Sequence, residues 1–177
     1  MGKIKEPRPV KLIASVFSGQ RALLAEASEA LEERFGALDY RSQLLPFDHT
    51  DYYAREFGEG LTRQILAFSK LVAPDRLALI KRTTNALELE WVAGERRQVN
   101  LDPGYVSPSK MVLATTKNYS HRIYLGDGIY AEVTLHYRQG AFHPWEWTYP
   151  DYASSRYLEI FGDIRQIYVS QLRERVA

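Results

Sequence analysis

The chain has 177 residues, 45% of them hydrophobic, which is enough to bury the core of one domain and excludes a disordered protein. Lysine and arginine number 23 against 22 acidic residues, so the net charge of +1 argues against charge-driven binding of nucleic acid. The absence of cysteine excludes disulfides, thiolate nucleophiles, iron–sulfur clusters and cysteine-rich zinc sites.

Residues 1–9 are charged, contain prolines and lack the apolar stretch of a secretory signal, so we expect a flexible tail. No stretch approaches the roughly 20 apolar residues of a membrane-spanning helix. We therefore expect a cytoplasmic protein without membrane contact, folded as one domain over residues 1–177.

The first part of the chain predicts a strand, a helix and a second strand. Residues 10–17 are apolar and β-branched and predict a buried strand that ends at a turn, Ser18-Gly19. A helix over 20–35 follows, with Ser18 at its start and Gly36 at its end. Residues 41–47 predict a short strand. The apolar positions of the helix have helical spacing: Leu23, Leu24, Ala27, Leu31 and Phe35.

The next part repeats this order. Polar caps predict a short helix over about 51–57, and residues 61–72 predict a strand. Pro74 begins a helix over 74–93, and residues 97–101 predict a strand that ends at the turn signal Asp102-Pro103-Gly104. The buried stripe of this helix is Leu77, Ile80, Thr84, Leu87 and Trp91. Apolar residues also lie off the stripe, so we expect cover on two sides, by the sheet and by another helix or a partner chain: Leu79, Leu89 and Val92.

Two successive strand–helix–strand units, over 10–47 and 61–101, predict an α+β fold with the ferredoxin-like βαββαβ arrangement. We expect this core to be elaborated with a C-terminal β-hairpin and a long C-terminal helix. Before the hairpin, Ser107-Pro108 predicts a short helix that ends near Lys117.

Residues 120–137 predict a hairpin around the turn Gly126-Asp127-Gly128. A three-residue loop pairs apolar with apolar and polar with polar residues, whereas a two-residue loop mixes the two faces. The predicted pairs are Leu125–Ile129, Tyr124–Tyr130, Ile123–Ala131 and Arg122–Glu132. The apolar face then holds Ile123, Leu125, Ile129, Ala131, Val133 and Leu135, and the polar face holds Arg122, Tyr124, Tyr130, Glu132, Thr134 and His136.

Residues 143–150 are aromatic and bracketed by prolines, which predicts an ordered loop or a sheet edge. Two alternatives remain open for Trp145, Trp147 and Tyr149: they plug the end of a core, or they stack a base or a sugar. A long amphipathic helix over about 152–175 ends the fold.

Several chemistries lack their motifs. The sequence has no Walker A loop, no Asn-Lys-x-Asp motif and no nucleophile elbow, although the Ser18-Gly19 turn before a helix offers backbone N–H groups to an anion. The hairpin register places His121 and His136 on opposite faces, so we assign no metal site. No cofactor is identified.

The polar face of the hairpin is the best candidate site. If it faces solvent, the pair of Arg122 with Glu132 contributes little and implies no function. If it lines a cleft, Arg122 would hold an anion, Glu132 would act as a general base or metal ligand, and Tyr124 and Tyr130 would stack or donate.

Long strings in the chain resemble an uncharacterised prokaryotic family, domain of unknown function family 4416. They are NLDPGYVSPSKMVLATTKNYSHRIYLGDGIYAEVTLHYRQG, which begins at residue 100, EWTYPDY, FDHTDYYAREFG at 47–58 and TNALE at 84–88. The resemblance extends over nearly the whole chain and implies no established activity. Members are sometimes labelled GTP-binding, whereas this sequence lacks the nucleotide motifs named above.

The resemblance also marks polar positions within these strings: Asp48, Thr50, Asn85, Glu88, Asn100, Asp102, Lys117, His121, Arg122, Glu132, Tyr149 and Asp151. We expect Asp102 to form a turn and Asp151 to cap a helix. Local geometry does not explain Glu88, Lys117 and the Arg122–Glu132 pair, so these are the preferred functional residues.

Two functions are predicted. The first is a domain that binds a small anionic or nucleotide-like metabolite, and as an enzyme it would use Glu132 or Glu88 for a proton or a cation. The ligand would be held by Lys117, Arg122, Tyr124, Tyr130, His121 and Asn85. The alternative is a non-catalytic interaction module that assembles, as a homo-oligomer or with a partner, through the 74–93 helix or the Trp-rich loop.

Overall fold

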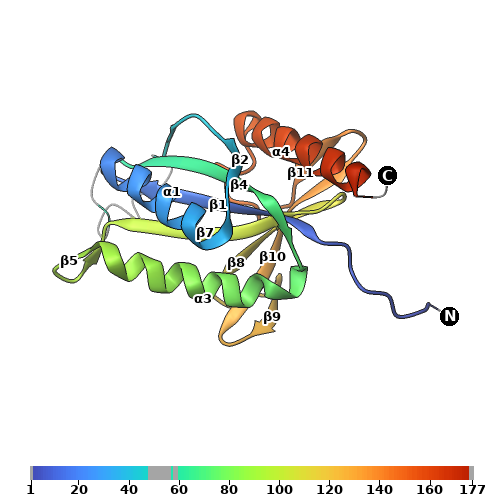
Figure 1. Ribbon diagram of the computed structural model, residues 1–177, viewed down its shortest axis with the longest axis horizontal. Helices are drawn as coiled ribbons and strands as arrows, with labels where there is room; N and C mark the ends of the chain where they lie inside the picture. Colours follow the sequence, from blue (N-terminus) through green and yellow to red (C-terminus); the bar gives the residue numbers. More distant parts are fainter. Residues whose placement is uncertain (1, 48–56, 58–59, 176–177) are drawn as a thin grey trace.

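A large antiparallel sheet crosses the molecule in the computed structural model, which describes residues 2–47, 57 and 60–175 (Figure 1). Its strands are β1 (Val10–Ser18), β2 (Leu38–Arg41), β3 (Leu45–Pro46), β4 (Thr62–Val72), β7 (Val99–Val106), β8 (Lys110–Thr115), β9 (Arg122–Gly126), β10 (Ile129–Arg138) and β11 (Ala141–Pro144). A separate pair consists of β5 (Val92–Ala93) and β6 (Arg96–Arg97). The helices are α1 (Arg21–Phe35), η1 (Pro74–Arg76), α3 (Leu77–Glu88), η2 (Leu89–Trp91) and α4 (Ser155–Glu174).

The strand order is β11-β10-β8-β7-β1-β4-β2, with β3 paired to β4 and β9 paired to β10. All these pairings are antiparallel. The mixed α+β class is therefore confirmed. Within the described residues the sheet has nine strands, which is more than the four of the expected βαββαβ arrangement.

Strand β1 is central and is buried along its whole length, as its apolar run predicts. Alternate side chains face opposite sides of the sheet. Leu12 and Val16 pack in the core that includes α1 and α3, whereas Ile13 packs in the core that includes α4. Helices thus cover both faces of this strand, which explains why its sequence is apolar at every position except Lys11, Ser15 and Ser18.

The predicted turn at Asp102-Pro103-Gly104 is wrong, because β7 continues through these residues to Val106. Pro103 lies opposite Ala14 of β1 and precedes the stretch of β7 that pairs with β8, so its missing N–H is tolerated. Asp102 is therefore a strand residue, and its carboxylate pairs with Lys81.

The helix predicted from Ser107 to Lys117 is also wrong, because β8 occupies most of this segment. A tight turn precedes the strand: Ser107 N–H donates to the Lys110 carbonyl at 2.8 Å, and Lys110 N–H donates to Ser107 Oγ at 3.2 Å. Met111 and Val112 then bury their side chains on opposite faces of the sheet, an arrangement that a helix would not provide.

Other boundaries shift by a few residues. The strand predicted over 41–47 is divided between β2 and β3, and the helix predicted over 74–93 ends as 3₁₀-helix at Trp91. The short helix expected over about 51–57 lies largely outside the described residues. Leu79 and Leu89 are exposed in the single chain, so no helix of the described part covers them, and cover by a partner chain stays a prediction.

The hairpin register is confirmed for Tyr124–Tyr130, Ile123–Ala131 and Arg122–Glu132. Near the turn, Ile129 pairs with Gly126 instead of Leu125, so the loop holds only Asp127 and Gly128 and the predicted three-residue loop is wrong. A second irregularity lies between Val133 and Leu135, where Thr134 has no partner on β8. Strict alternation of the two faces therefore ends at Thr134.

Helix α4 packs on one face of the sheet through Tyr157, Phe161 and Ile164. Ser154 is its N-cap residue, so the prediction that Asp151 caps this helix is wrong. Asp151 instead forms a buried ion pair with Arg63 of β4. No helix in the described part of the chain has the length and apolar character to cross a membrane, and the cytoplasmic location stays a prediction.

Candidate functional site

The best-connected polar cluster lies on the hairpin, as the sequence predicts. Glu132 is 3% exposed, and its Oε2 atom accepts a hydrogen bond from Arg122 Nε at 2.9 Å and lies 3.1 Å from His121 Nε2. Arg122 Nη2 is 2.8 Å from the same oxygen, and Thr134 Oγ1 donates to Glu132 Oε1 at 3.1 Å. The cross-strand register creates this cluster, because Arg122 lies directly opposite Glu132.

Lys117 joins this cluster through its main chain. Its carbonyl accepts a hydrogen bond from Arg122 Nη1 at 3.0 Å, and its N–H donates to Thr115 Oγ1 at 3.1 Å. The Arg122 guanidinium therefore bonds both Glu132 and the Lys117 carbonyl, and the side chain is only 5% exposed. These contacts join Arg122 to the loop and to Glu132, and its use as an anion clamp stays a prediction.

A column of stacked rings covers His121. The His121 ring lies 5.9 Å from Tyr119 and 5.2 Å from Trp147, and Trp147 lies 5.2 Å from Trp145. His136 contacts Trp145 at 4.3 Å, so both histidines adjoin the tryptophan pair and the expectation of opposite faces is wrong. His121 lies before the start of β9, and His136 lies after the irregularity at Thr134. The alternation of side chains between the two faces of the hairpin therefore does not extend to either histidine.

The Trp-rich loop, residues 143–150, also donates hydrogen bonds to main-chain carbonyls at the edge of β10. Trp147 Nε1 donates to the Val133 carbonyl at 3.1 Å, and Thr148 Oγ1 donates to the Thr134 carbonyl at 2.6 Å. Of the two alternatives for this segment, the structural plug is favoured, because Trp147 has a ring against each of its faces. An inserted base or sugar would have to displace one of these rings.

A shallow hollow of about 470 Å³ adjoins the hairpin cluster and is lined by Ser120, His121, Glu146 and Trp147. A ligand in it would meet the His121 imidazole, since Glu132 lies behind that ring and is almost inaccessible. The lining includes the exposed Glu146 carboxylate and no lysine or arginine, which disfavours an anion. The geometry offers a positioned imidazole, but it does not gather cations here.

The remaining predicted ligand residues lie elsewhere. Tyr124 and Tyr130 contact each other at 5.2 Å near the hairpin turn, where Tyr124 Oη accepts the Gly128 N–H. Asn85 is half-buried on α3. The structure therefore divides the candidate set: His121, Lys117 and the Arg122–Glu132 pair come together, whereas Asn85 and Glu88 belong to α3.

Glu88 belongs to a second cluster at the end of α3. Its Oε1 accepts the Leu101 N–H at 2.6 Å, and its Oε2 accepts from Arg97 Nη1 at 2.7 Å. Lys81 Nζ donates to the Leu101 carbonyl at 2.9 Å and to Asp102 Oδ1 at 2.8 Å. Burial raises the pKa of the Glu88 carboxyl above its ordinary value, although Lys81 and Arg97 lower it.

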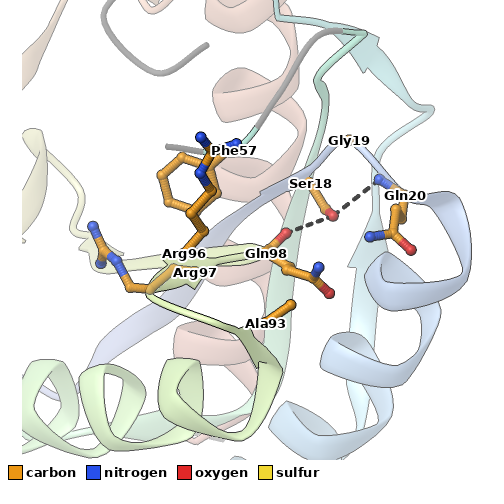
Figure 2. A pocket seen from close by; sticks show the side chains of 8 residues that line it. All are labelled: Ser18, Gly19, Gln20, Phe57, Ala93, Arg96, Arg97 and Gln98. Atoms are coloured by element: carbon orange, nitrogen blue, oxygen red, sulfur yellow. Dashed lines mark hydrogen bonds between the residues drawn. The ribbon is translucent and has the colours of Figure 1, made fainter. Parts of the chain in front are cut away.

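A smaller hollow of about 160 Å³ opens next to this second cluster (Figure 2). Ser18, Gly19 and Gln20 come from the connection between β1 and α1, and Ala93, Arg96, Arg97 and Gln98 come from the segment that leads into β7, with Phe57 completing the lining. Ser18 Oγ donates to the Gln98 carbonyl at 2.7 Å and accepts the Gln20 N–H at 3.0 Å, which joins the two sides (Figure 2).

The start of α1 is favourable for negative charge. Its N-cap residue Gln20 makes no side-chain capping bond, and its first turn contains no acidic residue. No side chain in the first turn of α1 therefore compensates the helix dipole at this end. The sequence predicts the Ser18-Gly19 turn as a possible anion site. It does not predict Arg96 and Arg97, because nothing in the local sequence indicates that residues near 97 lie close to residue 19.

The fold and these clusters define a mixed α+β protein with a nine-stranded antiparallel sheet, a buried ion pair on its outer hairpin and an arginine-lined hollow at the start of its first helix. A family model described as a domain of unknown function (DUF4416) matches residues 8–168. The chain therefore belongs to this family, as its motifs predict. No curated protein and no solved structure matches the chain.

Proposed function

We propose that the protein binds a small anionic metabolite, or the phosphate group of a larger one, in the hollow at the start of α1. The observation that carries this proposal is that Arg96 and Arg97 line the same hollow as Ser18, Gly19 and Gln20. Guanidinium groups and helix N-terminal N–H groups are both donors that recognise phosphate and carboxylate oxygens. Two kinds of anion-binding residue from distant parts of the chain thus line one hollow.

The surroundings support an anion of limited size. The Arg97 guanidinium is held by Glu88 and lies 5.3 Å from the Phe57 ring centroid, so it is positioned before a ligand arrives. Pockets that hold drug-sized ligands have volumes of about 300–1,000 Å³. A hollow of about 160 Å³ fits a phosphate group and leaves the rest of a nucleotide-like molecule outside. Glu88 acts here by orienting Arg97, instead of as the base that the sequence suggests.

Thermal shift measurements test this proposal with inorganic phosphate, pyrophosphate and nucleoside phosphates as probes. A ligand at 100 times its Kd raises the free energy of unfolding by about 2.7 kcal/mol, and so raises Tm. We expect Arg96→Gln to weaken the best probe about tenfold, which corresponds to about 1.4 kcal/mol for a lost charged hydrogen bond. Arg34→Gln is the matched control, because Arg34 is exposed at the other end of α1.

The control should leave the Tm shift of the native protein unchanged. The proposal fails if no probe shifts Tm at millimolar concentration. It also fails if Arg34→Gln weakens the probe as much as Arg96→Gln, since the effect would then reflect net charge alone.

An interaction module is the second candidate function. Leu89 of η2 is 68% exposed, and Leu79 of α3 and Val92 of β5 are also exposed. Exposed apolar side chains of this size favour a partner surface. Light scattering of Leu89→Glu tests this candidate, because assembly through α3 should then be lost.

We also propose that residues 10–106 form a ferredoxin-like unit to which β8–β11 and α4 are added. The order β7-β1-β4-β2 supports it, as does the packing of α1 and α3 in one core. A solved structure of a family member provides the test.

A further inference from the structure

Strand β9 has an open edge at the border of the sheet. In the described part of the chain, β10 is the only strand that pairs with it. Alternate residues of an outer antiparallel strand direct their N–H and C=O groups away from the sheet. Arg122 N–H donates to the Tyr119 carbonyl at 3.0 Å, so the open edge runs from Ile123 to Gly126.

The part of β10 beyond its pairing with β9 is covered by other segments of the chain. Beyond β9, Trp147 and Thr148 donate to the Val133 and Thr134 carbonyls of β10, and β11 pairs with the rest of that strand. The edge of β10 is therefore covered by β9, by Trp147 and Thr148 and by β11 in turn, whereas the outer edge of β9 is left exposed.

The side chains of β9 do not protect its edge. Soluble proteins usually guard outer strands with exposed lysine, proline or other charges. The strand contains neither lysine nor proline, and its one charge, on Arg122, is held by Glu132 inside the protein. Ile123, Tyr124 and Leu125 are 67%, 58% and 41% exposed. Three consecutive exposed apolar residues place apolar surface on both faces of this strand.

We propose that β9 pairs in antiparallel fashion with β9 of a second copy of this chain, which joins the two sheets into one. With the two-fold axis at Tyr124, Ile123 lies opposite Leu125 of the partner subunit, and Arg122 lies opposite Gly126 of the partner subunit. This register pairs apolar with apolar side chains and opposes no like charges. A shift by one residue would place Ile123 opposite Tyr124 of the partner subunit and mix the two faces.

A second copy fits this edge for two further reasons. The pairing is isologous, so the same five residues serve both subunits and a closed two-fold dimer results. The net charge of +1 makes repulsion between copies weak. An extended segment of a different protein is the competing occupant, and the experiments below separate the two.

Cysteine cross-linking tests the register directly, because the native chain contains no cysteine. Tyr124→Cys places two thiols opposite each other across the axis, where Cα atoms in an antiparallel pair are about 4.5–5.5 Å apart. A disulfide accepts about 4.4–6.8 Å. We expect mild oxidation to yield a reducible dimer of Tyr124→Cys and none of Leu44→Cys, whose site is also exposed but lies between β2 and β3, at the other end of the strand order.

Light scattering over a concentration series supplies the second readout. We expect a dimer mass for the native protein at high concentration, a monomer mass for Ile123→Lys and an unchanged dimer for Leu44→Lys. A native protein that stays monomeric, or a dimer that Ile123→Lys leaves intact, would overturn the proposal, and a dimer broken only by Leu89→Lys would assign assembly to α3. Equal cross-linking of the two cysteine variants would overturn it as well, and binding of an extended peptide by a monomeric native protein would assign the edge to a different partner.

Discussion

Glu132 and Glu88 are both buried carboxylates, and their neighbours determine what each can do. Glu132 is held by Arg122, His121 and Thr134 on the hairpin, and it positions these groups. Glu88 accepts the Leu101 N–H and pairs with Arg97, so it joins α3 to β7. The sequence predicts the Arg122–Glu132 pair from cross-strand register. It gives no sign of the partners of Glu88, which come from a strand that the chain reaches only through tertiary folding.

The raised pKa of Glu88 predicts a pH dependence of stability. Burial raises this pKa above its ordinary 4.5, so the folded protein binds the proton more readily than the unfolded chain. The stabilisation that this residue contributes is therefore full below pH 4.5 and is lost as the pH rises through the folded-state pKa. Urea unfolding of the native protein and of Glu88→Gln, from acidic to neutral pH, should show a difference in free energy of unfolding that moves in favour of the variant as pH rises.

The control for this comparison is Glu90→Gln, since Glu90 is exposed two residues further along. Its curve should run parallel to that of the native protein. Parallel curves for Glu88→Gln as well would show that Glu88 has the same pKa in both states.

At the scale of elements, β7 shows how tertiary contacts override a turn signal. Asp102-Pro103-Gly104 favours a turn by local conformation, yet β1 pairs with all three residues. Gly104 is required for a different reason, since a Cβ atom there would lie 2.3 Å from the Val112 carbonyl oxygen and 2.8 Å from Leu113 Cδ2. The glycine thus permits close approach of β7 and β8.

Substitution by alanine should have opposite effects at two glycines. Gly104→Ala forces backbone apart and should lower the free energy of unfolding by about 1–3 kcal/mol. Gly162 lies within α4 with no atom near its missing Cβ, so Gly162→Ala should raise it by about 1 kcal/mol through helix propensity. Denaturant unfolding measures both changes. A neutral Gly104→Ala would contradict the close approach of the two strands.

At the scale of the whole molecule, one buried ion pair connects the entry of α4 to the sheet. Arg63 of β4 pairs with Asp151, and its guanidinium lies 3.8 Å from the Phe47 ring centroid and 5.3 Å from that of Tyr152. Residues 88 positions apart in sequence are thus joined in the interior. The sequence predicts Asp151 only as a helix cap, because an aspartate before a helix looks the same in sequence whether it caps that helix or pairs with a distant arginine.

Loss of this pair should destabilise the fold strongly. Asp151→Asn leaves the buried Arg63 charge without its carboxylate, which should lower the free energy of unfolding by about 3–5 kcal/mol. Asp163→Asn on the exposed side of α4 is the matched control and should change it by less than about 0.5 kcal/mol. Thermal and denaturant unfolding of both variants checks this expectation, and similar losses in the two would contradict it.

The sequence by itself determined the elements whose signals are local. The buried strand β1, the helices α1 and α4 and the register of Arg122 with Glu132 all follow from periodicity, capping or turn residues within one segment. Only the tertiary structure decided that β7 continues through Pro103 and that residues 110–115 form a strand. It also brought Arg97 beside Gly19, because long-range strand pairing and burial outweigh local preferences of a kcal/mol or so per residue.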